Sequence, residues 1–154
     1  MLKQGFFLRK FSFTFIITGF LLILSSFNLS PDGLVNDVLS YTNQFRRSKG
    51  KEMLIMRDDL NAIARKHSEN MAKGRIGFGH SGFDQRHSQA KRIFKSCTMA
   101  ENVAYGASNG REAVKMWKNS SGHRSNMLGN YKYIGIGTAK DRRGTIYYTQ
   151  IFVR

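Results

Sequence analysis

The stretch Glu101-Asn-Val-Ala-Tyr-Gly106, followed by Trp117-Lys-Asn-Ser-Ser-Gly-His-Arg-Ser-Asn-Met-Leu128, decides how this chain is organised. A carboxylate opens an apolar run in the first part, and His123 follows Glu101 by 22 positions. His80 precedes Glu101 by 21 positions and lies in a glycine-rich segment. Two histidines and one carboxylate form a candidate metal or acid–base site, provided that the fold brings them together.

The chain of 154 residues is strongly basic, with a formal charge of +15. Lys3, Arg9 and Lys10 carry three of these charges, and the rest of the chain carries +12. Such a field attracts nucleic acid, anionic lipid and acidic envelope polymers without sequence preference. The cations are dispersed, and no zinc-finger or RNA-binding signature accompanies them. The sequence therefore favours a solvated basic surface and no specific nucleic-acid partner.

The first 28 residues have the pattern of a signal peptide or an N-terminal membrane anchor. Residues 1–10 are basic, and residues 11–27 form a 17-residue run without any charge. The run is close to the shortest that can span a bilayer, and the cleavage sites of small residues around Ser25 and Ser26 are poor. Cleavage and anchoring by residues 11–27 both stay open. In either case the basic N-terminal end remains on the cytoplasmic side of the membrane, and the domain that follows the leader is secreted or extracytoplasmic.

The single cysteine, Cys97, cannot close an intramolecular disulfide. An exported domain with this sequence must therefore be stable without disulfides. Nothing in the neighbouring sequence supplies a base to activate the thiol, so we expect a bystander cysteine rather than a nucleophile.

Hydrophobic periodicity predicts an α+β fold in residues 34–154. A first helix of about 15 residues begins near Leu34 and ends in cations followed by Gly50. The sequence then predicts a helix that begins at Asp58 or Asp59 and carries His67 as a hydrogen-bonded core residue. Trp117 and Met116 are expected on a later helix, with their side chains in the core of the domain. The other expected elements are a loop over 74–82, a short helix over 84–94, a buried strand over 99–105, a short turn or helix over 123–128, and strands over 133–139 and 145–153 joined by a hairpin at 141–144.

These motifs, in this order, resemble the CAP superfamily of cysteine-rich secretory, antigen 5 and pathogenesis-related 1 proteins, whose domain is also called SCP. The pieces that carry the resemblance are residues 60–71, Gly79-His80 with Phe83 and Arg86, residues 101–106, 113–117, 121–128, 134–137 and 147–152. The resemblance covers residues 34–154 and is strongest to compact bacterial members. It implies export and a three-layer α–β–α sandwich preceded by the N-terminal hydrophobic helix.

The resemblance also implies a cleft lined by His80, Glu101 and His123. Larger members carry a second glutamate three residues after the tryptophan, where this chain has Ser120, and the family's cysteines are missing as well. His80 and His123 are suited to bind zinc, and Glu101 to act as a third ligand, an orienting group or a general base. A structural hydrogen-bond cluster of the same three residues is an equal alternative, and Arg86 and Asn126 are interpreted as structural.

Two functions follow from these features. The first is an extracytoplasmic module that binds a lipid, a peptide or a cell-envelope component, which the lipid-binding members of the family make reasonable. The alternative is a metal-assisted, peptidase-like hydrolase that acts on peptides or cell-wall material through Glu101, His80 and His123. No serine or cysteine shows the nucleophile-with-base arrangement of a covalent hydrolase.

Overall fold

The computed structural model describes residues 31–154, which form five helices and four strands. The predicted leader, residues 1–28, lies outside the described residues. Within residues 31–154, no helix is long and apolar enough to cross a membrane. The elements in chain order are α1 (Pro31–Arg47), β1 (Ile55–Met56), α2 (Asp58–Ala72), α3 (Phe83–Phe94), β2 (Met99–Tyr105), α4 (Gly110–Asn119), α5 (Ser121–Leu128), β3 (Tyr133–Lys140) and β4 (Ile146–Val153).

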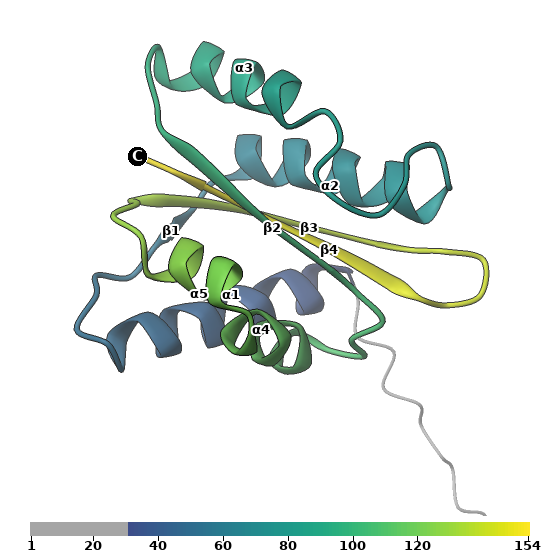
Figure 1. Ribbon diagram of the computed structural model, residues 1–154, viewed down its shortest axis with the longest axis horizontal. Coiled ribbons are helices and arrows are strands. Elements are labelled where there is room, and N and C mark those ends of the chain that lie inside the picture. Colours follow the sequence, from purple (N-terminus) through teal and green to yellow (C-terminus); the bar gives the residue numbers. More distant parts are fainter. Residues whose placement is uncertain (1–30) are drawn as a thin grey trace, which may run out of the picture.

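The four strands form one sheet in the order β1-β3-β4-β2 (Figure 1). β1 pairs in parallel with β3, and the other pairs are antiparallel. β4 lies between β3 and β2, and almost all of its residues are buried. The register places Glu101 of β2 opposite Ile151 of β4.

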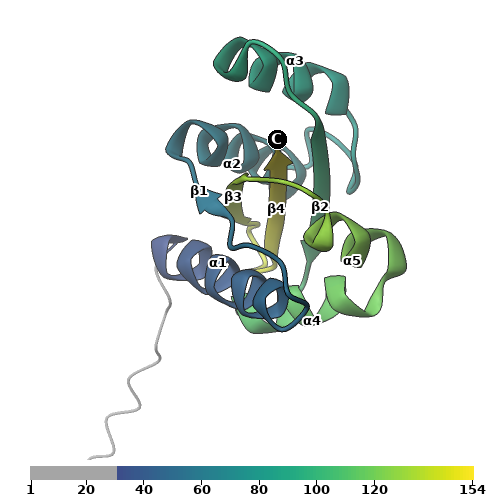
Figure 2. The ribbon, with the colours of Figure 1, turned by 90° about the vertical axis from the view of Figure 1, so that its left-hand side faces the viewer.

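Helices cover both faces of the sheet, which confirms the predicted three-layer α–β–α sandwich (Figures 1 and 2). α2 and α3 lie on one face, and α1, α4 and α5 lie on the other. Side chains alternate between the faces along β4, so Tyr148 and Phe152 join the core with α1 and α4. Ile151 and Val153 join the second core with α2 and α3.

Two glycines of β3 allow α2 to lie directly on the sheet. A Cβ atom at Gly135 would overlap backbone atoms of Leu60, and one at Gly137 would overlap backbone atoms of Ala64 and Arg65. This close approach places the C-terminal half of α2, including His67 and Ser68, against the buried strands.

The predicted elements are present, with four differences in detail. β1 was not predicted, because two residues are too short for a periodic pattern. The predicted turn or helix over 123–128 is a helix, α5, which begins two residues earlier at Ser121. Met116 is 46 % exposed, because α4 turns Ala113, Val114 and Trp117 inward instead, so the prediction that Met116 lies in the core was wrong.

Arg46 is the fourth difference, since the sequence indicated only a cation at the end of a helix. Its side chain is buried, and it donates hydrogen bonds to the carbonyl oxygens of Glu52 (2.8 Å), Met127 (2.7 Å) and Gly129 (2.9 Å). Burial lowers the pKa of its guanidinium below the ordinary value. Arg46 therefore ties the end of α1 to the end of α5.

Candidate functional site

Glu101 lies on β2 with its side chain toward α3, and it is only 4 % exposed. Arg86 of α3 donates from Nε to Oε2 at 2.6 Å and from Nη2 to Oε1 at 2.7 Å. The same guanidinium donates to the carbonyl oxygens of Ser81 (2.8 Å) and His80 (3.3 Å). Arg86 thus neutralises a buried carboxylate and holds the loop that precedes α3.

His80 lies on that loop and contacts the same carboxylate. Its Nδ1 is 2.9 Å from Oε1 of Glu101, and its side chain is 48 % exposed. A carboxylate partner favours the tautomer in which Nδ1 carries the proton and donates. The other ring nitrogen, Nε2, is then the atom that can accept a hydrogen bond or bind a metal.

His67 of α2 is a third imidazole near Glu101. It is 2 % exposed, and its Nε2 lies 2.9 Å from the carbonyl oxygen of Gly79 and 3.8 Å from Oε1 of Glu101. Burial, and then the charge of Arg86, lower the pKa of His67, although Glu101 opposes the shift. His67 is therefore neutral at pH 7 and donates to Gly79, which confirms the sequence interpretation of a hydrogen-bonded core histidine.

His123 lies on α5, near the other two predicted site residues. Burial, and then the charge of nearby His80, lower its pKa, so its imidazole is neutral at pH 7. The backbone around it is held by β2: Asn102 donates to the carbonyl oxygen of His123 at 3.1 Å. Asn126 donates to the carbonyl oxygen of Glu101 at 3.1 Å and to Oδ1 of Asn102 at 2.9 Å.

The fold thus places His80 against Glu101 and the backbone of His123 against Asn102 of β2, and it adds Arg86 as a direct partner of Glu101. Ser120, which replaces the second glutamate, directly precedes α5. Across residues 31–154, no group of three or more His, Cys, Asp or Glu residues is arranged to hold a metal ion. Since Arg86 engages both oxygens of Glu101, the donors that remain are the two imidazoles. Zinc sites in proteins commonly use three or four protein ligands, which is more than two imidazoles alone supply.

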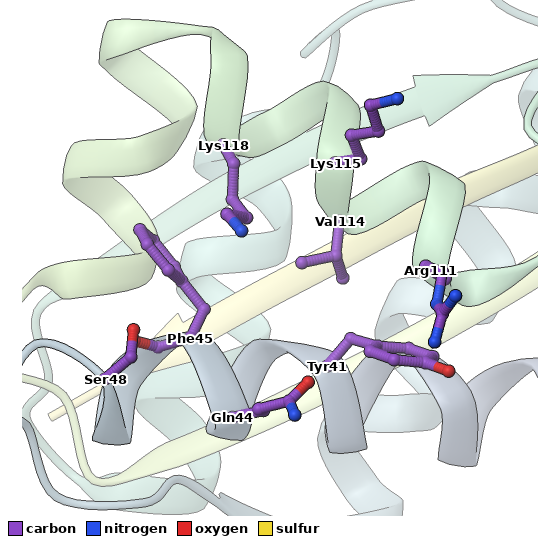
Figure 3. Close-up of a pocket in the computed structure, with 8 residues that line it drawn as sticks. All are labelled: Tyr41, Gln44, Phe45, Ser48, Arg111, Val114, Lys115 and Lys118. Carbon is purple, nitrogen blue, oxygen red and sulfur yellow. The ribbon is translucent and has the colours of Figure 1, made fainter.

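A second feature is a groove between α1 and α4 with a volume of about 490 Å³ (Figure 3). Its apolar part comes from Phe45, Val114 and the ring of Tyr41. Arg111 lies over the ring of Tyr41 at 5.2 Å, and Lys118 lies over the ring of Phe45 at 5.0 Å. The complete lining is Tyr41, Gln44, Phe45, Ser48, Arg111, Val114, Lys115 and Lys118, which includes three cations and no carboxylate.

Sequence reasoning missed this groove, although a signal was present. Arg111, Lys115 and Lys118 are spaced four and three residues apart and so share one face of a helix. Tyr41 and Phe45 are four residues apart in another helix. What the sequence did not give is the packing of α1 against α4, which brings the two faces together.

Comparison with known proteins identifies the class. The sequence pattern of the CAP family, the cysteine-rich secretory protein family, matches residues 39–152. YkwD, an uncharacterized protein of Bacillus subtilis strain 168, is 35% identical over 123 residues, or 75% of this chain and 45% of YkwD. YlbC, an uncharacterized membrane protein of the same organism, is 31% identical over 132 residues, or 76% of this chain and 33% of YlbC.

Solved structures agree with this class. An extracellular protein containing an SCP domain from Bacillus anthracis matches with a TM-score of 0.67 and 26% identity, over 82% of this chain and 44% of that one. A cysteine-rich secretory protein from Staphylococcus aureus matches with a TM-score of 0.64 and 26% identity, over 80% of this chain and 39% of that one. The chain belongs to the CAP family, and it spans less than half the length of these relatives.

Proposed function

We propose that this CAP domain works outside the cytoplasm as a binding module for an anionic amphiphile, which it holds in the groove between α1 and α4. The location is supported by the relatives named as extracellular or membrane proteins. The proposal depends above all on the lining of the groove, where an apolar floor meets three cations without a carboxylate. An acyl chain fits the floor, and an acidic head group fits the cations.

The size of the groove supports a small ligand. Its volume of about 490 Å³ falls within the range of roughly 300–1,000 Å³ that is usual for small-molecule sites. Val114 and Phe45 are both buried and form an apolar floor, so the apolar surface that leaves water on binding is mainly that of the ligand's own chain. The rim cations Arg111 and Lys118 already pack on aromatic rings, which orders them before a ligand arrives.

The geometry at Glu101 favours binding over hydrolysis. A general base needs a carboxylate oxygen that can reach a water molecule, and Arg86 donates a hydrogen bond to each oxygen of Glu101. Glu101 is also almost completely buried. In this arrangement Glu101 orients His80, which is the structural alternative that the sequence left open.

Titration of a fluorescent long-chain fatty acid into the full chain tests the proposal. We expect Arg111→Ser with Lys118→Ser to weaken binding about tenfold, since two exposed charge contacts contribute up to about 1 kcal/mol each. The matched control is Lys49→Ser with Lys51→Ser, which removes the same charge from exposed positions outside the groove. Absence of binding, or equal weakening in both variants, would contradict the proposal.

A metal-assisted hydrolase is the second candidate, favoured by the neutral imidazole of His123 close enough to His80 to feel its charge. Calorimetric titration of zinc into the full chain and into a His80→Ala, His123→Ala variant tests it. Micromolar binding that the variant loses would favour this candidate and lead to assays with peptide and cell-wall substrates. No binding to the unaltered chain would leave the three residues with a structural role.

A further inference from the structure

A basic groove lies at the end of the molecule where the β3–β4 hairpin meets the segment after α2. Figure 1 shows the hairpin extending from the sheet beneath that segment. The groove has a volume of about 780 Å³ and is lined by Ala72, Lys73, Gly74, Arg75, Lys140, Asp141, Arg142 and Arg143. Five of these eight residues are cations, and all five are exposed.

The single carboxylate in the lining, Asp141, forms its hydrogen bonds within the hairpin turn. Oδ1 of Asp141 accepts hydrogen bonds from the backbone N–H groups of Arg143 and Thr145, each at 2.9 Å. The turn closes further through the N–H of Gly144, which donates to the carbonyl oxygen of Asp141 at 3.1 Å. Gly144 has a φ of +87°, which favours glycine. Asp141 therefore fixes the backbone that carries Arg142 and Arg143 at the tip of the groove.

Within the part of the chain that the structure describes, the cations of the hairpin have no acidic partner. Among residues 31–154, Lys140, Arg142 and Arg143 form no ion pair. On the α2 side, Lys73 lies 3.6 Å from Glu69, and Arg75 donates to Oδ1 of Asn70 at 3.5 Å. Like charges in one groove repel one another, so an anionic ligand would relieve an unfavourable interaction as well as form new ones.

We propose that this groove binds a linear polymer with repeating phosphodiester groups. Three of the five cations are arginines, whose planar guanidinium groups match phosphate oxygens with two hydrogen bonds at once. The cations come from two separate segments, residues 73–75 and 140–143, so they can contact successive phosphates along one chain. An envelope polymer of phosphodiester-linked polyols is the occupant that fits, and this choice over nucleic acid depends on the extracytoplasmic location proposed above.

The test is the fluorescence anisotropy of a labelled glycerol-phosphate oligomer mixed with the full chain at two salt concentrations. We expect Arg142→Ser with Arg143→Ser to weaken binding at least tenfold. The slope of log affinity against log salt should fall by roughly 1.4, because each lost phosphate contact accounts for about 0.7 in a single-stranded polyanion. Arg142→Lys with Arg143→Lys keeps the charge and should retain most of the salt slope with weaker binding.

The control is again Lys49→Ser with Lys51→Ser, which lowers the net charge equally but leaves this groove intact. An equal loss in this variant, or no binding by the unaltered chain, would overturn the proposed site. Glycerol-phosphate binding at least as tight as that of a single-stranded oligonucleotide of equal charge supports the envelope polymer, and tighter oligonucleotide binding overturns that choice. The fatty-acid test of the α1–α4 groove uses other residues, so either proposal can fail alone.

Discussion

Glu101 keeps a buried position on β2 because Arg86 donates hydrogen bonds to both of its oxygens. Replacement of Arg86 by methionine would leave the buried Glu101 carboxylate with His80 as a hydrogen-bond partner but without its guanidinium counter-ion. We expect Arg86→Met to lower the free energy of unfolding by about 3–5 kcal/mol, measured by urea denaturation. The loop that carries His80 should also become more mobile, since Arg86 holds its backbone carbonyls.

The double variant Arg86→Met, Glu101→Leu controls this measurement. It removes the pair together, so no unpaired charge remains, and part of the lost stability should return. A double variant as unstable as Arg86→Met would show that the cost comes from lost packing around Arg86 rather than from an unpaired Glu101.

His67 gives the domain a pH dependence with a defined sign. Its pKa in the folded state is lowered from the ordinary 6.5, so the unfolded chain takes up a proton first as the pH falls. The free energy of unfolding should therefore decrease below pH 6.5, by at most about 1.4 kcal/mol per pH unit, until folded His67 is protonated too. Above pH 6.5 both states are neutral, and His67 contributes no slope.

Urea denaturation between pH 5 and 8 measures this dependence, with His67→Gln as the comparison. Glutamine keeps a donor for Gly79 but cannot titrate, so the slope below pH 6.5 should become smaller. His123 has a lowered pKa as well, and a remainder of the slope is expected from it. An unchanged slope in His67→Gln would mean that other groups govern the acid sensitivity.

Single residues of the site were predictable from sequence to the extent that their roles are local. His67 could be assigned to the core because it falls on the apolar stripe of one helix. The pairing of Arg86 with Glu101 joins residues 15 positions apart on α3 and β2, and no local pattern encodes that contact. The sequence interpretation of Arg86 as a structural residue agrees with its hydrogen bonds to the carbonyl oxygens of Ser81 and His80, but it missed the bonds to the Glu101 carboxylate.

At the scale of elements, the contact between α2 and β3 depends on two glycines of the strand. Gly137→Ala would push a Cβ atom into the backbone of Ala64 and Arg65. We expect a loss of about 2–3 kcal/mol in the free energy of unfolding, because neither the helix nor the central sheet can move freely. Thermal and urea denaturation both measure this loss.

Gly122→Ala provides the matched control, because a Cβ atom there meets nothing within 4 Å. Gly122 lies in α5, where alanine is the better helix former, so stability should stay constant or rise by up to about 1 kcal/mol. If both variants lost the same free energy of unfolding, the loss would come from the restricted backbone of alanine relative to glycine and not from the close approach of α2 to β3.

Most elements were predictable because their apolar residues recur with a clear period. The 15-residue α2 and the eight-residue β4 each bury a continuous set of side chains. β1 has two residues and is recognisable as a strand only because it pairs with Tyr133 and Ile134 of β3. Met116 was assigned wrongly, because an apolar residue beside Trp117 on a helix points about 100° away from it.

For the whole molecule, the two cores and the hydrogen-bonded interior supply the stability without a disulfide. Cys97 is the only cysteine, and burial raises the pKa of its thiol. We expect a reducing agent to leave the melting temperature unchanged and alkylation of Cys97 at pH 7 to be slow. A melting temperature that falls with the reductant would instead reveal a disulfide between two copies of the chain.

Within residues 31–154, β4 is made after the other three strands, although it lies between two of them in the sheet. β4 follows β2 and β3 in the chain, and among the strands of residues 31–154 β2 pairs with β4 alone. Until β4 is made, β2 therefore lacks its partner and β3 lacks one of its neighbours, and contacts of such long sequence separation form slowly. For the exported protein proposed above, we expect this order of synthesis to delay completion of the sheet until residues 146–153 have been made.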